Sequence, residues 1–256
     1  MTINIQNAQD LTSPWTSWFI YGATGSGKTS ICATFPQPFF IVPANEKSIN
    51  TLQGMNVQYV EVGKRNDMYQ VLDFLEGRYN DMLRLMSQGD DTAANVAFPW
   101  QTIVVESISH YSDLVIEDLS QGGTKQMDYQ QWGKLGSHLR TIQMRLRALD
   151  VHSLFTSLDK VSDDGQHAGP LISGQMATKM PSACDYIVYC EAVGATMKDK
   201  PAVYRAHFRQ FGKFPARVRQ SPVSAKQHGA FPPMIDNFHF DKISKFLGIT
   251  LTAQEG

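Results

Sequence analysis

The 256-residue sequence is poor in cysteine, in long hydrophobic runs and in net charge, and each shortage excludes a class of protein. Its three cysteines form no CxxC pair, which argues against a disulfide framework or a zinc site and predicts reduced, packed thiols. No apolar run approaches the ~20 residues that span a bilayer, and the first residues lack the charged and apolar regions of a signal peptide. We therefore expect a soluble cytoplasmic protein without a membrane partner.

The charges nearly cancel, with 23 Lys and Arg against 24 Asp and Glu, which excludes a globally cationic coat for nucleic acid. Their distribution is uneven. Residues 198–228 carry eight basic side chains and a single acidic one. Such a segment is either a solvated face or a surface for phosphate groups, those of nucleic acid or those of a nucleotide on a neighbouring subunit.

Short apolar runs alternate with amphipathic stretches along the chain. The runs are typical of buried strands and lie at 17–21, 38–42, 101–105, 151–156 and 185–189, with 203–208 as a hairpin partner. Apolar side chains at helical spacing predict helices over 67–86 and 132–149, the second with Trp132 in its core stripe. Residues 87–95 and 162–174 are expected to be loops. This pattern indicates an α/β fold with a mostly parallel twisted sheet, helices on both faces and a strand-rich C-terminal part.

One motif points to specific chemistry. The segment GATGSGKT matches G-x-x-x-x-G-K-[ST] between a predicted strand and a predicted helix start. Its glycines let backbone N–H groups turn toward a phosphate, Lys28 reaches the β- and γ-phosphates, and the Thr29 hydroxyl ligates Mg²⁺. The expected nucleotide-binding residues are Gly22, Ala23, Thr24, Gly25, Ser26, Gly27, Lys28, Thr29 and Ser30.

Polar residues at the ends of other predicted strands complete the expected site. Glu106 follows the third strand and is the candidate metal ligand, although aspartate is more usual there. Glu46 follows the second strand and is the candidate catalytic base beside Lys28, because we expect that strand to lie next to the P-loop strand. Ser157 and Asp159 follow the fourth strand, where they either sense the γ-phosphate or are ordinary polar strand ends.

The order of these features resembles that of RecA-fold P-loop ATPases, and within them the compact phage-encoded RecA-like single-strand-annealing proteins. The likeness spans about residues 14–220 and rests on the P-loop, on TIVVES at 102–107, on YQQWGKL at 129–135 and on GKFPAR at 212–217. It implies a single RecA-like ATPase domain over residues 1–256, with 221–256 as a C-terminal extension. The chain departs from the family pattern at Glu106 and in lacking His or Gln at the sensor position.

The resemblance also implies cofactors and partners. It implies ATP with Mg²⁺, bound between subunits of a homo-oligomer, and single-stranded DNA, with a single-strand-binding protein as a further candidate partner in the host cytoplasm. By position, Lys213 and Arg217 resemble cations that reach a neighbour's γ-phosphate. The DNA-binding candidates by position are Lys125, Lys160 and Lys179, with Tyr129 as a residue that stacks on bases.

The leading hypothesis is an Mg²⁺-dependent ATPase, stimulated by single-stranded DNA, that promotes annealing or homologous recombination as an oligomer. Two other functions use the same loop. A nucleotide kinase would need an arginine-rich lid, and the predicted loop at 162–174 contains no arginine. An ATP-gated assembly or adaptor protein would use nucleotide only to switch contacts between subunits, without acting on DNA.

Overall fold

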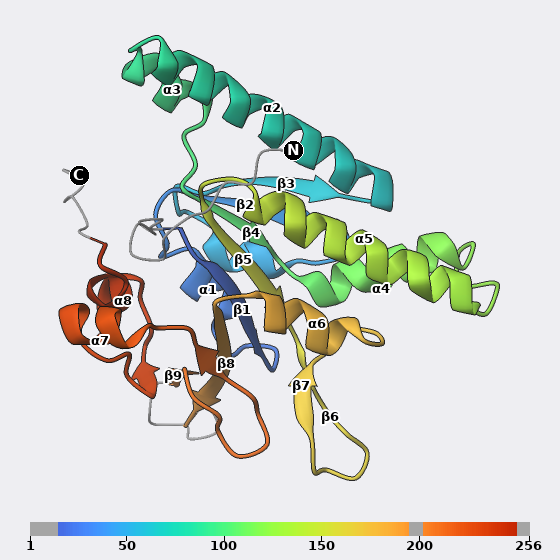
Figure 1. Ribbon diagram of the computed structural model, residues 1–256. Coiled ribbons are helices and arrows are strands. Elements are labelled where there is room, and N and C mark those ends of the chain that lie inside the picture. Colours follow the sequence, from blue (N-terminus) through green and yellow to red (C-terminus); the bar gives the residue numbers. More distant parts are fainter. Residues whose placement is uncertain (1–14, 195–201, 250–256) are drawn as a thin grey trace, which may run out of the picture.

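The computed structural model describes residues 15–194 and 202–249, which form a twisted sheet with helices on both faces (Figure 1). The sheet has the order β11-β9-β8-β1-β5-β4-β2-β3, and β10 also pairs with β8. The strands from β8 to β3 in this order run parallel, and β9, β10 and β11 are antiparallel additions. The strands are β1 (Ser17–Gly22), β2 (Pro38–Pro43), β3 (Gln58–Val62), β4 (Thr102–Val105), β5 (His152–Ser157), β8 (Tyr186–Val193), β9 (Val203–His207), β10 (Arg217–Val218) and β11 (Met234–Asp236).

The expected position of β2 beside the P-loop strand is wrong. β1 lies between β5 and β8, so that both β5 and β4 separate it from β2. Buried parallel strands all have similar, continuous apolar sequences, so the sequence of a strand does not show which strand it pairs with. The carboxyl ends of these strands still share one edge of the sheet, which keeps the residues after β2 close to the P-loop.

Two apolar clusters cover the two faces of the sheet. Along β1, Phe19 and Tyr21 belong to one cluster, whereas Trp18 and Ile20 belong to the other. The first cluster lies under α2, α4, α5 and α6, and the second under α1 and the C-terminal residues. The helices are α1 (Lys28–Cys32), α2 (Arg65–Ser87), α3 (Asp91–Ala97), α4 (Ile108–Leu119), α5 (Tyr129–Arg147), α6 (Met176–Ala183), α7 (Pro222–His228) and α8 (Asp241–Ser244), with 3-10 turns at Ser48–Leu52 and Lys245–Leu247.

The C-terminal residues complete the second face. β11 adds to the edge of the sheet beside β9, and Phe238 and Phe240 are buried against Phe35. The expected α/β fold is therefore confirmed in its class, its mostly parallel sheet, its helices on both faces and its strand-rich C-terminal part. The three cysteines are free and buried. No helix in the described ranges has the length and apolarity needed to cross a membrane.

Three local expectations are wrong. The loop expected at 87–95 is helical from residue 91, where α3 begins, because the Asp90 side chain accepts the Ala93 N–H at 2.9 Å and caps the helix. The loop expected at 162–174 is partly a hairpin of β6 (Asp159–Val161) and β7 (Ala168–Pro170). Trp132 is 42% exposed rather than part of the core, whose first α5 member is Leu135, because the start of α5 extends past the sheet.

Candidate active site

The P-loop connects β1 to α1 at the carboxyl edge of the sheet. Gly22 must be glycine, because a Cβ there would lie 2.1 Å from the carbonyl oxygen of Cys190 on β8. Gly25 and Gly27 have φ values of +77° and +85°, in the left-handed region that favours glycine. These conformations curl the loop so that its backbone N–H groups can converge on an anion.

Lys28 is folded inside this loop. Its ammonium donates to the carbonyl oxygens of Gly22 and Ala23, each at 2.8 Å, and weakly to Ser26 Oγ at 3.4 Å. Burial lowers the pKa of Lys28, and the nearby Glu106 carboxylate opposes that shift. The weak third hydrogen bond is the one that a phosphate oxygen can replace, while the two strong bonds keep the loop in shape.

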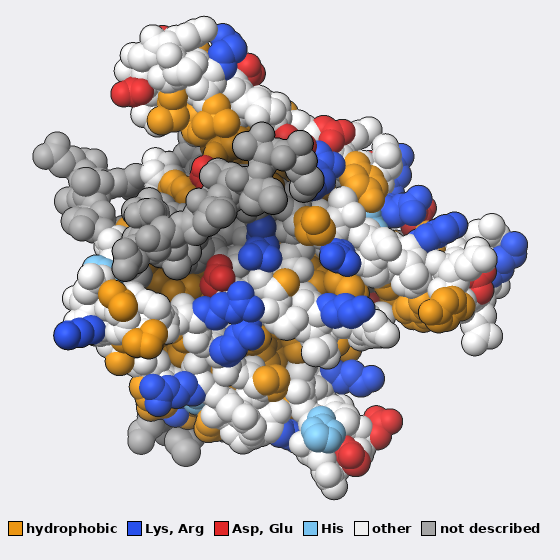
Figure 2. All heavy atoms as spheres, in the orientation of Figure 1, with side chains coloured by type: hydrophobic (Ala, Val, Ile, Leu, Met, Phe, Trp, Pro, Cys, Tyr) orange, Lys and Arg blue, Asp and Glu red, His pale blue; other side chains and the backbone are white. Residues whose placement is uncertain are grey.

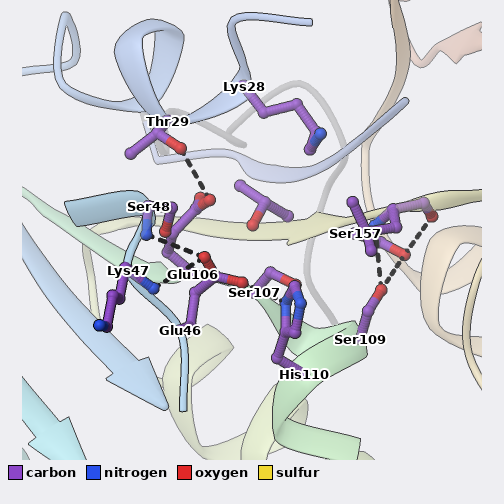
Figure 3. A network of polar contacts seen from close by, with 12 residues as sticks. Lys28, Thr29, Glu46, Lys47, Ser48, Glu106, Ser107, Ser109, His110 and Ser157 are labelled. Carbon is purple, nitrogen blue, oxygen red and sulfur yellow. Dashed lines mark hydrogen bonds and ion pairs between the residues drawn. The ribbon is translucent and has the colours of Figure 1, made fainter. Parts of the chain in front are cut away.

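Glu106 and Thr29 meet beside the loop. Thr29 Oγ1 donates to Glu106 Oε1 at 2.8 Å (Figure 3). The Thr156 hydroxyl is another polar group near this carboxylate, but the buried Oε2 has no hydrogen bond of good geometry within the described residues. Burial raises the pKa of Glu106. An unpaired buried acceptor costs about 1–3 kcal/mol, which a cation at Oε2 would remove. The pair therefore fits Mg²⁺, which proteins bind through one or two side chains together with phosphate oxygens.

Glu46 lies in the same cleft as this pair, and both of its carboxylate oxygens have partners. Its Oε1 accepts the backbone N–H groups of Lys47 and Ser48 at 2.9 and 2.8 Å, and its Oε2 lies 2.5 Å from His110 Nδ1 (Figure 3). His110 is on the first turn of α4 and also lies 3.2 Å from Ser107 Oγ. These contacts fix both carboxylate oxygens of Glu46 at the wall of the cleft that the P-loop also lines.

Together these residues line one cleft of about 500 Å³. It joins the P-loop to the ends of β2 and β4, two segments far from it in the sequence. The lining residues include Thr24, Gly25, Gly27, Lys28, Thr29, Ser30, Glu46, Ser48, Glu106, His110, Leu158 and Tyr204. The structure thus brings the expected base, metal ligands and phosphate loop together in a space large enough for a nucleotide.

The candidate sensors, Ser157 and Asp159, are not among the residues that line the cleft. The Ser157 hydroxyl lies 2.9 Å from Ser109 Oγ and 2.8 Å from the Leu158 carbonyl, so it links β5 to α4. Leu158, rather than Ser157, lines the cleft. Asp159 begins the β6–β7 hairpin and is half-buried.

The two candidate finger cations differ in their surroundings. Arg217 donates to the carbonyl oxygens of Ser182 and Cys184 at 3.1 and 2.9 Å, which ties β10 to the end of α6 in its own chain. Lys213 is exposed at the tip of a turn and donates to the Gly165 carbonyl at 3.0 Å. Figure 2 shows Lys and Arg side chains around α6 and the start of β8. Lys198 and Lys200 of the basic segment lie outside the described residues.

The candidate DNA contacts fall into two groups. Lys160 lies on β6 of the hairpin and Lys179 lies on α6, and both are exposed. Lys125 lies in the α4–α5 connection, beside the start of α5, where Tyr129 is 93% exposed and Trp132 is 42% exposed. The end of the α4–α5 pair therefore presents a cation together with two aromatic rings.

The sequence pattern did not reveal His110, Ser48 or Tyr204 as cleft residues. His110 lies on the first turn of α4, which begins two residues after Glu106, so its place beside the cleft could have been inferred from a helix that starts directly after this strand end. Ser48 Oγ is buried without a hydrogen-bond partner in the described part of the chain. Tyr204 comes from a strand whose place in the sheet no local pattern reveals.

The chain was compared with known proteins. A family model described as an AAA domain matches residues 16–221, which is most of the chain. No curated protein matches the sequence. Among solved structures, the chain is similar to the crystal structure of the KaiC-like protein PH0186 from the hyperthermophilic archaeon Pyrococcus horikoshii OT3, with a TM-score of 0.43 and 13% identity over 79% of this chain and 81% of that chain. So remote a likeness says nothing about what this chain binds.

Proposed function

Because the chain belongs to the AAA domain family and is thus a P-loop ATPase, we propose that it hydrolyses ATP with Mg²⁺ and binds single-stranded DNA as a homo-oligomer, promoting annealing or homologous recombination. The observation that carries the ATPase part is the convergence of Lys28, Thr29, Glu106 and Glu46 on one cleft. A loop that only binds phosphate needs no second carboxylate. Glu46 lines the same cleft as the P-loop without belonging to the metal pair, as a base acting on water requires.

The residues divide the work of hydrolysis. Loop N–H groups and Lys28 bind the β- and γ-phosphates, while Thr29 and Glu106 hold the cation. Mg²⁺, when bound, offsets the charge of the phosphate oxygens. The Glu46 carboxylate orients a water molecule and accepts its proton, while the two N–H groups on Oε1 and His110 beside Oε2 keep the carboxylate in place. Catalysis in this cleft rests on positioning and charge rather than on covalent chemistry.

The DNA part of the proposal rests on the exposed start of α5. Aromatic rings in water normally pack inward, yet Tyr129 is almost fully exposed and Trp132 nearly half so. Rings that stack on successive bases beside a cation are the usual means of binding single strands without reading sequence. Lys125 supplies that cation. Lys160 and Lys179 would extend a phosphate track past α6.

The experiment is ATP hydrolysis with and without a single-stranded oligonucleotide, using Lys28→Ala as the inactive control. We expect turnover that DNA stimulates and that the Lys28 variant abolishes. Turnover that depends on Lys28 but not on DNA would contradict the DNA part alone. Nucleotide binding without any turnover would instead favour an assembly protein that nucleotide switches, and it would remove the catalytic role of Glu46.

A further inference from the structure

Tyr204 is a tyrosine that lines the cleft beside the P-loop. It belongs to β9, and its ring packs against the P-loop, because a Cβ on Gly27 would lie 3.0–3.4 Å from its carbon atoms. The side chain is 41% exposed, so part of the ring is open to the cleft or to solvent. A partly exposed ring that lines the cleft beside the phosphate loop can offer a π-face to a bound nucleotide.

The order of the sheet places Tyr204 on a particular side of that loop. Glu46 and Glu106 follow β2 and β4, which lie on one side of β1. Tyr204 is on β9, which lies on the other side of β1, beyond β8. The carboxylates attract the cation and with it the γ-phosphate end of a triphosphate. The opposite end of the nucleotide, which carries the base, must then lie toward β9.

The backbone of Tyr204 is fixed where this role needs it. Its N–H donates to Asn237 Oδ1 at 3.1 Å, and its carbonyl oxygen accepts the Asn237 N–H at 2.5 Å. The strand around it pairs with β8, with Ala192 opposite Tyr204. A ring carried by a doubly anchored strand loses little conformational freedom on binding, which favours stacking.

We propose that Tyr204 stacks on the base of the bound nucleotide, so that the cleft binds nucleoside triphosphates more tightly than bare polyphosphate. This inference rests on the proposed function, because it concerns the same cleft. Stacking tolerates any base, since every base has a π-face. The residue therefore selects for the presence of a base rather than for adenine over guanine.

The test measures the affinity of Mg²⁺-ATP and of Mg²⁺-tripolyphosphate for wild type, Tyr204→Ala and Tyr204→Phe by calorimetry. We expect Tyr204→Ala to weaken ATP binding about 5- to 100-fold and to leave tripolyphosphate binding unchanged. Tyr204→Phe keeps the ring and should bind both ligands like wild type. Tyr59→Ala removes a half-exposed tyrosine from β3, at the far edge of the sheet, and is the matched control.

The outcomes separate the two proposals. If Tyr204→Ala weakens both ligands alike, the ring only shapes the P-loop and this inference is wrong. If it weakens neither, the base lies elsewhere and the inference is again wrong, while the proposed nucleotide site stands. Wild type that binds neither ligand, with its fold shown by a normal melting transition, would overturn the proposed function and this inference together.

Discussion

Glu46 is the residue on which the proposed chemistry depends most directly. Replacing it with glutamine removes the base but keeps the shape of the side chain and an oxygen for the N–H groups of Lys47 and Ser48. We expect kcat to fall about 10²- to 10⁴-fold, the usual contribution of a general base, with ATP affinity nearly unchanged. Steady-state kinetics together with a binding titration measure both quantities. Unchanged kcat would assign the base to another group.

A second prediction at the scale of one residue concerns His152, which is buried at the start of β5. Its Nδ1 lies 2.9 Å from the Thr16 hydroxyl and 3.3 Å from the Thr16 N–H, and burial lowers its pKa to about 4. The unfolded chain, with an ordinary histidine pKa, binds the proton more readily between pH 4 and 6.5. Stability must therefore rise with pH across that window, by about 3 kcal/mol from this residue.

Urea unfolding of wild type and His152→Asn at pH 7, 6, 5 and 4 tests that prediction. The asparagine cannot titrate, so the variant should lose stability less steeply below pH 6.5. His138 is also buried, with a pKa lowered to about 4, and it should preserve part of the slope in the variant. Equal slopes in the two proteins would show that His152 is not the group that titrates.

The role of a single residue was predictable from the sequence where neighbouring positions together form the functional group. The P-loop is such a case, because eight adjacent positions form the whole phosphate cradle. The contact between Glu46 and His110 is not, since it joins residues 64 positions apart along the chain through the packing of α4 beside β2. Glu106 was found because a strand end can be read locally, whereas its unpaired oxygen required the surrounding packing.

At the scale of elements, the start of α5 is where the sequence pattern wrongly predicted a buried Trp132. It is also the surface that the proposed function assigns to single-stranded DNA. The Asp128 side chain accepts the Gln131 N–H at 2.7 Å, and the Gln131 side chain accepts the Asp128 N–H at 2.8 Å. This capping box begins the helix beyond the edge of the sheet. The apolar spacing at Trp132 was read correctly as helical, but spacing alone does not show where the sheet ends.

The double variant Tyr129→Ala/Trp132→Ala tests that surface. We expect single-stranded DNA affinity to fall about 30-fold or more, because two bases lose their stacking partners at a cost of about 1–3 kcal/mol each. ATP turnover without DNA should not change. Fluorescence anisotropy at several salt concentrations is the measurement, and Met144→Ala, which removes a 60% exposed side chain from the same helix, is the control. Unchanged affinity would place DNA elsewhere.

At the scale of the whole molecule, the proposed homo-oligomer predicts that Lys213 acts on the nucleotide of a neighbouring subunit. Lys213 does not line its own chain's cleft and lies at the tip of the turn between Phe211 and Phe214. Phe214 stacks on Tyr189 at 4.0 Å between ring centroids, and Phe211 stacks on His207 at 4.1 Å. The turn thus holds an exposed cation rigidly. In the proposed oligomer, Lys213 would exchange its hydrogen bond to the Gly165 carbonyl for a contact with a neighbour's nucleotide.

Mixing two inactive variants distinguishes a finger in trans from one in cis. Glu46→Gln lacks the base, and Lys213→Ala lacks the finger, so each oligomer alone should be inactive. In a one-to-one mixture, a Lys213→Ala subunit supplies an intact cleft and a Glu46→Gln neighbour supplies the lysine. Random assembly through a head-to-tail interface then restores about a quarter of wild-type turnover. Glu46→Gln mixed with Lys28→Ala is the control and should restore nothing, because both residues belong to the cleft of one chain. A Lys213 mixture that stays inactive, although the subunits co-assemble, would show that the lysine does not act across the interface.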